Sequence, residues 1–261
     1  CAVEYAPFML VGMGKNNPRF WSDWGTTLMR LAEYRNESRF IEDAVEKYGI
    51  CVSLCLEEGE ENPFKAEFLY NYGCSLDFLG DFSDDESYYE RSIEALTESV
   101  ELDSNHSHAR YNLALSLSHL GELTNDIDCF KKAIAYYEVL AEEDQEDEMT
   151  WNEWGLVLLN LAQLLKDPSD PEHDLKLYHE AEIRLLRAVS LGSLMAYYNL
   201  TCLYSLTGHI PSAMHFLGKA EANQILPSID DMMHDEWLQN LRKTNDFQAF
   251  INLLLAKRKQ G

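Results

Sequence analysis

Few side chains in this chain have the type and spacing for chemistry, and the tightest groups place histidines beside aspartates. The groups are Asp103 with His106 and His108, and His173 with Asp174 and His179. Imidazole nitrogens and carboxylates at such short spacing can bind a metal ion. Both groups fall at a boundary or an insertion between apolar runs, where solvated polar residues are common. We therefore expect no metal ion and no other cofactor.

The sequence lacks the motifs that mark catalytic centres. It has no glycine-rich phosphate loop, G-x-S-x-G elbow, H-E-x-x-H helix or C-x-x-C pair. Neighbouring carboxylates occur at Asp84 and Asp85 and at Asp230 and Asp231, but exposed acidic pairs usually mark helix starts. We therefore expect that the protein is not an enzyme.

The six cysteines lie mostly within apolar helical patterns. Cys51 and Cys55 are four residues apart and share a helix face, so a metal site there would need ligands from elsewhere. Reduced thiols that pack as small apolar side chains are the simpler interpretation. They indicate a cytoplasmic or other reducing compartment. A mature lipoprotein that begins at Cys1 remains an alternative.

Acidic residues dominate and are concentrated in the first part of the chain. The net charge is −24 over 261 residues, and residues 1–150 carry 32 acidic and 11 basic side chains, a balance of −21. Such a field repels phosphate backbones and attracts cationic segments. We therefore expect a protein partner and no nucleic acid, although acids that only keep a helical protein in solution are an equal alternative. No apolar run reaches about 18 residues, so no membrane span is expected.

A motif that occurs five times indicates the elements that must position these side chains. Its occurrences are Trp21-x-x-Trp24-Gly25-x-x-Leu28, Leu69-x-x-Tyr72-Gly73-x-x-Leu76, Arg110-x-x-Leu113-Ala114-x-x-Leu117, Trp151-x-x-Trp154-Gly155-x-x-Leu158 and Tyr197-x-x-Leu200-Thr201-x-x-Tyr204. A small residue within a second apolar run follows each one, at Ala44, Ser92, Ala133, Ala181 and Ala213. Small residues let two helices approach closely. Such repetition is typical of stacked helical hairpins.

The pattern resembles the tetratricopeptide repeat (TPR) family, whose two helices read W-x-x-L-G-x-x-Y and A-x-x-x-F-x-x-A. The closest matches are Ala109-Arg110-Tyr111-Asn112-Leu113-Ala114 and Ala196-Tyr197-Tyr198-Asn199-Leu200. The resemblance implies an all-α, right-handed superhelical solenoid of TPR-like hairpins. Its repeats are expected at about 19–58, 63–104, 107–143, 149–192 and 194–225. Residues 1–18 are interpreted as an N-terminal segment left from an earlier repeat, and 226–261 as capping helices.

The spacing between the small positions differs from that of an ordinary TPR, which is about twelve residues. It is 19 from Gly25 to Ala44, from Gly73 to Ser92 and from Ala114 to Ala133, 26 from Gly155 to Ala181, and 12 from Thr201 to Ala213. An excess of seven is close to two helical turns and keeps the apolar face in phase. We expect second helices that begin about two turns early, with Ser83 opening a capping box. A loop of the same length is the alternative.

In TPR proteins the first helices line an inner groove, and the resemblance assigns such a groove to this chain. The predicted binding residues are Arg30, Tyr70, Asn71, Cys74, Asp77, Tyr111, Asn112, Leu115, His119, Asn152, Leu156, Tyr198 and Asn199. The same mapping adds Ser22, Thr26, Phe78, Ser118, Asn160, Cys202 and Ser205. Tyrosine rings offer contact area and amides can pair with a ligand backbone. Rings that only pack between repeats are the alternative.

The sequence thus predicts a docking or chaperone-like adaptor that holds a basic or amphipathic segment of a partner protein. A self-assembling scaffold, which would form homo-oligomers, and the regulatory part of a larger enzyme remain alternatives. We also expect Trp237, Leu241, Phe247 and Phe250 to pack on the fifth repeat, because terminal repeats need caps.

Overall fold

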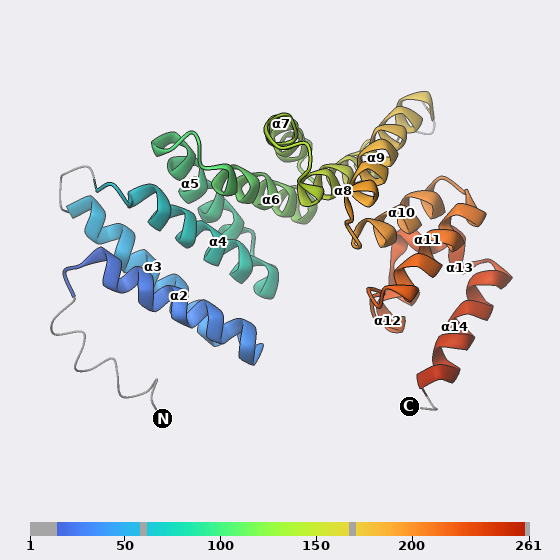
Figure 1. Ribbon diagram of the computed structural model, residues 1–261, viewed down its shortest axis with the longest axis horizontal. Helices are drawn as coiled ribbons and strands as arrows, with labels where there is room; N and C mark the ends of the chain where they lie inside the picture. Colours follow the sequence, from blue (N-terminus) through green and yellow to red (C-terminus); the bar gives the residue numbers. More distant parts are fainter. Residues whose placement is uncertain (1–14, 58–61, 167–170, 259–261) are drawn as a thin grey trace. The chain divides into compact units, whose positions relative to one another are not determined.

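The computed structural model describes residues 15–57, 62–166 and 171–258, and every regular element in these ranges is helical (Figure 1). Consecutive helices joined by short connections form the arrangement that the repeats predict, so the all-α fold of TPR-like hairpins is confirmed. None of the helices in these ranges is long and apolar enough to cross a membrane.

The helices follow one another in pairs, numbered as in Figure 1. The pairs are α2 (Pro18–Arg35) and α3 (Ser38–Glu57), α4 (Lys65–Ser83) and α5 (Glu86–Leu102), α6 (Ser107–Thr124) and α7 (Ile127–Glu143), α8 (Glu148–Leu164) and α9 (Pro171–Leu191), and α10 (Ala196–Leu206) and α11 (Ile210–Ala222). The chain divides into two compact units, residues 1–136 (unit 1) and 137–261 (unit 2), so the division falls within α7.

The recurring glycine of the motif lies where the two helices of a hairpin touch. A Cβ atom added at Gly73 would lie 2.5 Å from Cγ of Leu96 on α5, and one added at Gly25 would lie 2.8 Å from the ring of Tyr48 on α3. Both partners are buried. The glycine therefore recurs in these hairpins because the partner side chain leaves no room for a Cβ atom at this contact.

Three hairpin turns in unit 1 share one backbone conformation. Each first helix is followed by a residue in the left-handed region, Asn36, Asp84 or Asn125, with φ of 53°, 51° and 57°. Asparagine and aspartate adopt this region more readily than other residues with a side chain. Each backbone N–H donates to a carbonyl of the preceding turn, which ends the helix.

The predicted capping box at Ser83 is wrong. Ser83 is the last residue of α4, and its hydroxyl donates to the carbonyl of Leu79 at 2.8 Å. Asp85 instead caps α5, because its carboxylate accepts from the N–H of Ser87 at 3.0 Å. The turn needs its left-handed residue first, and the capping residue of the next helix can only follow it.

The insertions of seven residues are helical, as predicted, but they lengthen both helices of a hairpin. In the fifth repeat α10 ends five residues after Thr201 and α11 begins three residues before Ala213. In the second repeat α4 ends ten residues after Gly73, and α5 begins six residues before Ser92. The predicted start of the second helix two turns early is therefore wrong here. It does hold in the fourth repeat, where α9 begins ten residues before Ala181.

The cap of unit 2 consists of three short elements and one longer helix. They are α12 (Ile229–His234), the 3₁₀ helix η1 (Glu236–Leu238), α13 (Gln239–Arg242) and α14 (Asn245–Arg258). Leu241 and Phe247 are fully buried in one cluster with Leu217 of α11, and Trp237 and Phe250 pack partly buried against it. The expected cover of the fifth repeat is thus confirmed.

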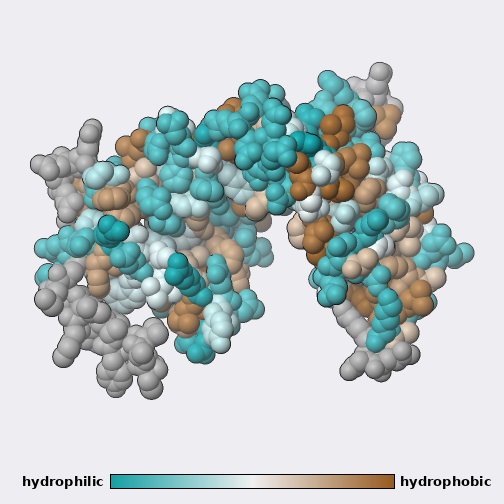
Figure 2. Space-filling view, viewed as in Figure 1, coloured by the Kyte–Doolittle hydropathy of each residue, from teal (hydrophilic) through white to brown (hydrophobic). Residues whose placement is uncertain are grey.

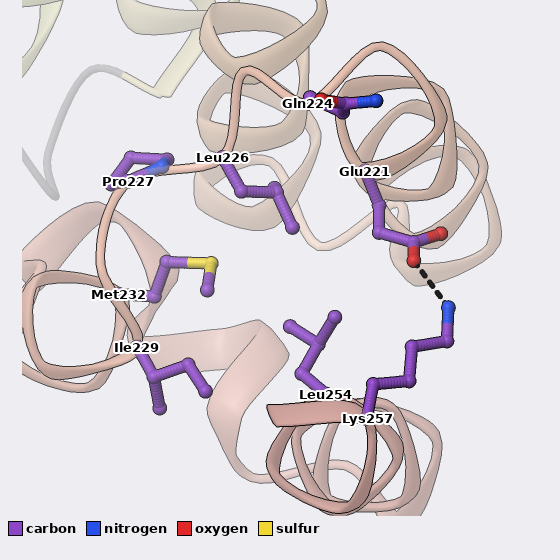
Figure 3. A pocket seen from close by; sticks show the side chains of 8 residues that line it. All are labelled: Glu221, Gln224, Leu226, Pro227, Ile229, Met232, Leu254 and Lys257. Carbon is purple, nitrogen blue, oxygen red and sulfur yellow. Dashed lines mark hydrogen bonds and ion pairs between the residues drawn. The ribbon is translucent and has the colours of Figure 1, made fainter. Parts of the chain in front are cut away.

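A pocket of about 260 Å³ lies within this cap (Figure 3). Leu226, Met232 and Leu254 point toward its centre, and Ile229 forms part of the wall. The ammonium of Lys257 on α14 meets the carboxylate of Glu221 at 2.6 Å on one side. The ion pair ties α14 to α11, so the pocket belongs to the packing of the cap and is too small for a peptide helix.

Candidate functional site

The predicted binding residues of unit 1 lie on three first helices, α2, α4 and α6, and α4 contacts the other two. We call the following set the first-helix face: Tyr70, Asn71, Cys74, Asp77, Phe78 and Asp81 of α4, and Tyr111, Asn112, Leu115 and His119 of α6. Most of these side chains are half-buried, Phe78 and Asp81 are exposed, and Asp77 is buried. Arg30 of α2 is exposed.

Tyr70 and Cys74 form one end of the first-helix face. The Tyr70 ring lies 4.8 Å from the ring of His106, the residue that caps α6 through its Nδ1. Burial raises the pKa of the Cys74 thiol to about 12, and burial together with the neighbouring Cys74 raises that of Tyr70. Both groups therefore stay protonated at neutral pH and can act as hydrogen-bond donors. On α6, the amide of Asn112 donates to the carbonyl of His108 at 2.9 Å.

His119 and two aspartates meet at the other end of the face. Nδ1 of His119 on α6 lies 3.2 Å from Oδ1 of Asp77 and 3.5 Å from Oδ1 of Asp81, both on α4. The hydroxyl of Tyr89 on α5 donates to the same oxygen of Asp81 at 2.8 Å. Three helices of unit 1 thus contribute to one polar cluster, which we call the His119 cluster.

The charges of the His119 cluster shift its protonation. Burial by itself would lower the pKa of His119, but the hydrogen bond to Asp77 and the charges of Asp77 and Asp81 raise it to about 9. Burial raises the pKa of the Asp81 carboxyl, although His119 and the Tyr89 hydroxyl act in the opposite direction. At neutral pH His119 is therefore an imidazolium ion held by carboxylates.

The second hairpin, formed by α4 and α5 and longer than the fifth, supplies Asp81 and Tyr89 of the His119 cluster. A Cβ atom at Gly80 would lie 2.7 Å from Cε1 of Tyr89, so only a glycine lets the Tyr89 ring pack there. The packed ring brings its hydroxyl to Asp81, one residue further along α4. Asp81 stands eight residues after Gly73, whereas α10 ends five residues after its own small position.

In unit 2 the predicted residues make contacts within the chain. Asn152 of α8 is buried, and its side-chain oxygen accepts from the amide of Asn199 on α10 at 3.0 Å. The hydroxyl of Tyr198 donates to Oδ2 of Asp235 in the cap at 2.7 Å, and the Cys202 thiol points to the same oxygen at 3.8 Å. Leu156 is half-buried. The hydroxyl of Tyr198 therefore has a partner already.

The histidine groups that stand out in the sequence supply none of the residues of the His119 cluster. His106 caps α6, His108 is exposed, and Asp103 accepts from the N–H of Asn105 at 3.0 Å in the turn before α6. His179 is exposed beside Glu182, and the side chains of His173 and Asp174 lie outside the described residues. The sequence named Asp77 and His119 as groove residues but missed Asp81 and Tyr89. The spacing Asp77-x-x-x-Asp81, which puts two carboxylates on one helix face, could have indicated Asp81.

Paired helices in series, with a polar face along the first helices of unit 1, define a helical-repeat protein. Residues 107–139, which span α6 and most of α7, match the family model described as "Tetratricopeptide repeat". The chain therefore contains a tetratricopeptide repeat, and the resemblance stated from the sequence is confirmed.

Solved structures of MamA proteins share the fold. "Crystal structure of MamA protein" aligns with a TM-score of 0.53 at 17% identity, covering 86% of this chain and 97% of that chain. "MamA 41-end from Desulfovibrio magneticus RS-1" aligns with a TM-score of 0.51 at 17% identity, covering 79% and 98%. No curated protein sequence matches this chain. At such identities the likeness concerns the fold alone.

Proposed function

We propose that the chain is a protein-interaction module whose first-helix face holds a basic, amphipathic segment of a partner protein. The observation that carries the proposal is the composition of this face, which combines Tyr70 and Tyr111 with the exposed carboxylate of Asp81 on neighbouring helices. The function is docking, in the manner of an adaptor, and needs no catalytic group.

An apolar contribution comes from two phenylalanines next to the carboxylates. Phe78 and Phe82 are 37% and 47% exposed, and their rings lie 5.7 Å apart on α4. Exposed aromatic residues are frequent anchors of protein interfaces. A segment with lysines on one side and apolar side chains on the other would match both features.

Electrostatic attraction would speed the association of such a basic segment with the protein. Residues 1–150 carry a balance of −21, and complementary charge mainly speeds association. The molecule is largely hydrophilic on the side shown in Figure 2, with apolar residues in separate patches. This surface fits a partner segment that is attracted by charge and is then held by contacts with the aromatic side chains.

Two labelled helical peptides test the proposal, one with lysines and one with glutamates on the polar side of the same apolar pattern. Fluorescence anisotropy should show binding of the lysine peptide alone. Tyr70→Ala should weaken it by about 1 to 3 kcal/mol, as expected for an interface hot spot.

The matched control is Tyr34→Ala, because Tyr34 is 84% exposed on α2 outside the first-helix face. This change should leave the affinity unaltered. Equal binding of both peptides, or the same affinity in Tyr70→Ala as in the wild type, would contradict the proposed site.

A further inference from the structure

The His119 cluster has the ligand types and the spacing of a transition-metal site. Nδ1 of His119 and one oxygen each of Asp77 and Asp81 lie within 4.8 Å of one another. Ligand bonds of about 2.0 to 2.1 Å around a tetrahedral ion put neighbouring ligand atoms about 3.3 to 3.4 Å apart. The distances from Nδ1, 3.2 Å and 3.5 Å, lie on either side of this value.

The helices hold the three side chains in a suitable arrangement. Asp77 and Asp81 are four residues apart, so both carboxylates project from one side of α4. His119 approaches them from α6, a neighbouring helix of the same compact unit. Only side-chain rotations are then needed to place three donor atoms around one ion.

A hydrogen bond and partial exposure complete the site. The Tyr89 hydroxyl holds Oδ1 of Asp81 at 2.8 Å, the kind of contact that orients ligands in metal sites. The Asp81 side chain is 43% exposed, His119 24% and Asp77 10%, so an ion could enter from the side of Asp81. A water molecule can supply the fourth ligand there.

We propose that Asp77, Asp81 and His119 bind a divalent transition-metal ion of the zinc class. The imidazole nitrogen selects against Ca²⁺ and Mg²⁺, which take oxygen ligands, and the absence of a thiolate among these three donors selects against Cu⁺. In the metal-bound form Nδ1 of His119 faces the ion and the ring proton is on Nε2.

Equilibrium titration of the full chain with ZnCl₂, after treatment with EDTA, tests the proposal. Visible absorption of the Co²⁺ complex reports the coordination geometry independently. We expect one ion per chain with a tetrahedral Co²⁺ spectrum. His119→Gln and Asp81→Asn should abolish this binding. Tyr89→Phe keeps the ring over Gly80 but removes the hydrogen bond, and should weaken the affinity about tenfold.

His234→Gln is the matched control. His234 of α12 also lies beside an aspartate, Asp230, at 3.6 Å, but has one carboxylate partner and is exposed. Zinc binding should not change in this variant. Binding that survives both His119→Gln and Asp81→Asn would overturn the proposal, as would binding lost on alkylation of the cysteines alone. Absence of stoichiometric binding in the wild type would do the same. Circular dichroism shows whether each variant is folded, and the exposed Asp81 offers a test if His119→Gln is not.

Discussion

The first helices of the second and fifth repeats carry the same three residue types around their small position and use them differently. Tyr70, Asn71 and Cys74 stand before and after Gly73 as Tyr198, Asn199 and Cys202 stand around Thr201. In the fifth repeat the tyrosine and the cysteine both meet Asp235 of the cap. In the second repeat the tyrosine lies against His106, and the helix continues to Asp81.

The difference lies in what packs on each helix and in how far the helix continues. Ser205, four residues after Thr201, is fully buried, and its hydroxyl oxygen accepts from the N–H of Leu241. Asp77 takes the same position after Gly73 and faces His119. In the short fifth hairpin the cap thus covers the first helix, whereas the longer second hairpin adds Asp81 and Tyr89 to a polar cluster.

The largest expected effect tests the cover of the short hairpin. Phe247→Ala should lower the free energy of unfolding by about 3 to 5 kcal/mol, because Phe247 is fully buried among Leu217 of α11, Leu241 and other apolar side chains. Urea unfolding monitored by circular dichroism measures the change. Leu253→Ala on the same helix is the control, since Leu253 is 63% exposed and its loss should stay within about 0.5 kcal/mol. A loss in Phe247→Ala as small as the one expected for Leu253→Ala would show that the cap contributes little.

A smaller effect is expected from the contact that builds the long hairpin. Gly80→Ala should cost about 1 to 3 kcal/mol, because the new Cβ atom would lie 2.7 Å from the Tyr89 ring. Gly218→Ala on α11 meets nothing within 4 Å and should stabilise the protein by about 0.5 to 1 kcal/mol. Thermal unfolding compares the two substitutions. If Gly80→Ala were also stabilising, the close packing of Tyr89 on α4 would be refuted.

A further expected effect is a dependence of stability on pH that comes from His119 of the long second hairpin. The pKa of His119 is raised to about 9, above its unfolded value of about 6.5, so its contribution is complete below pH 6.5 and is lost as the pH rises through 9. Urea unfolding in EDTA should therefore show stability falling across this range in the wild type.

Buried thiols also contribute to the pH dependence of stability at the upper end of this pH range. The pKa of Cys51 and Cys74 is raised to about 12 by burial, so unfolded thiolates also favour unfolding above about pH 8.5. His119→Gln keeps these thiols and should remove only the part that begins near pH 6.5. Parallel pH profiles of the variant and the wild type would contradict the ion pairs of His119.

The sequence predicts the helices well because their signal is local and repeated. Gly73 and Leu96 touch through a fixed spacing that recurs as Gly25 and Tyr48, so a pattern of residue types is sufficient. The turn at Asp84 was predicted incorrectly because serine and aspartate are both good capping residues. Only the backbone conformation decides that Asp85 caps the next helix.

The site was less accessible from the sequence. Asp81 and His119 are separated by 38 positions on two helices, and their contact depends on how far α4 continues past Gly73. The contact of Tyr198 with Asp235 depends on a cap whose short elements have no repeated pattern. Such contacts follow from tertiary packing, which the residue pattern does not encode locally.

The shared left-handed turn also has a consequence for how such a chain changes by mutation. The segments 32–41, 80–89 and 121–130 each run from a small residue through this turn to the side chain packed on it. Because each residue turns a helix by about 100°, gain or loss of seven codons spread over both arms leaves the packed sides nearly aligned, whereas one codon in one arm misaligns them. Hairpin length in this protein should therefore change in steps close to whole helical turns, with both helices of a hairpin changing together.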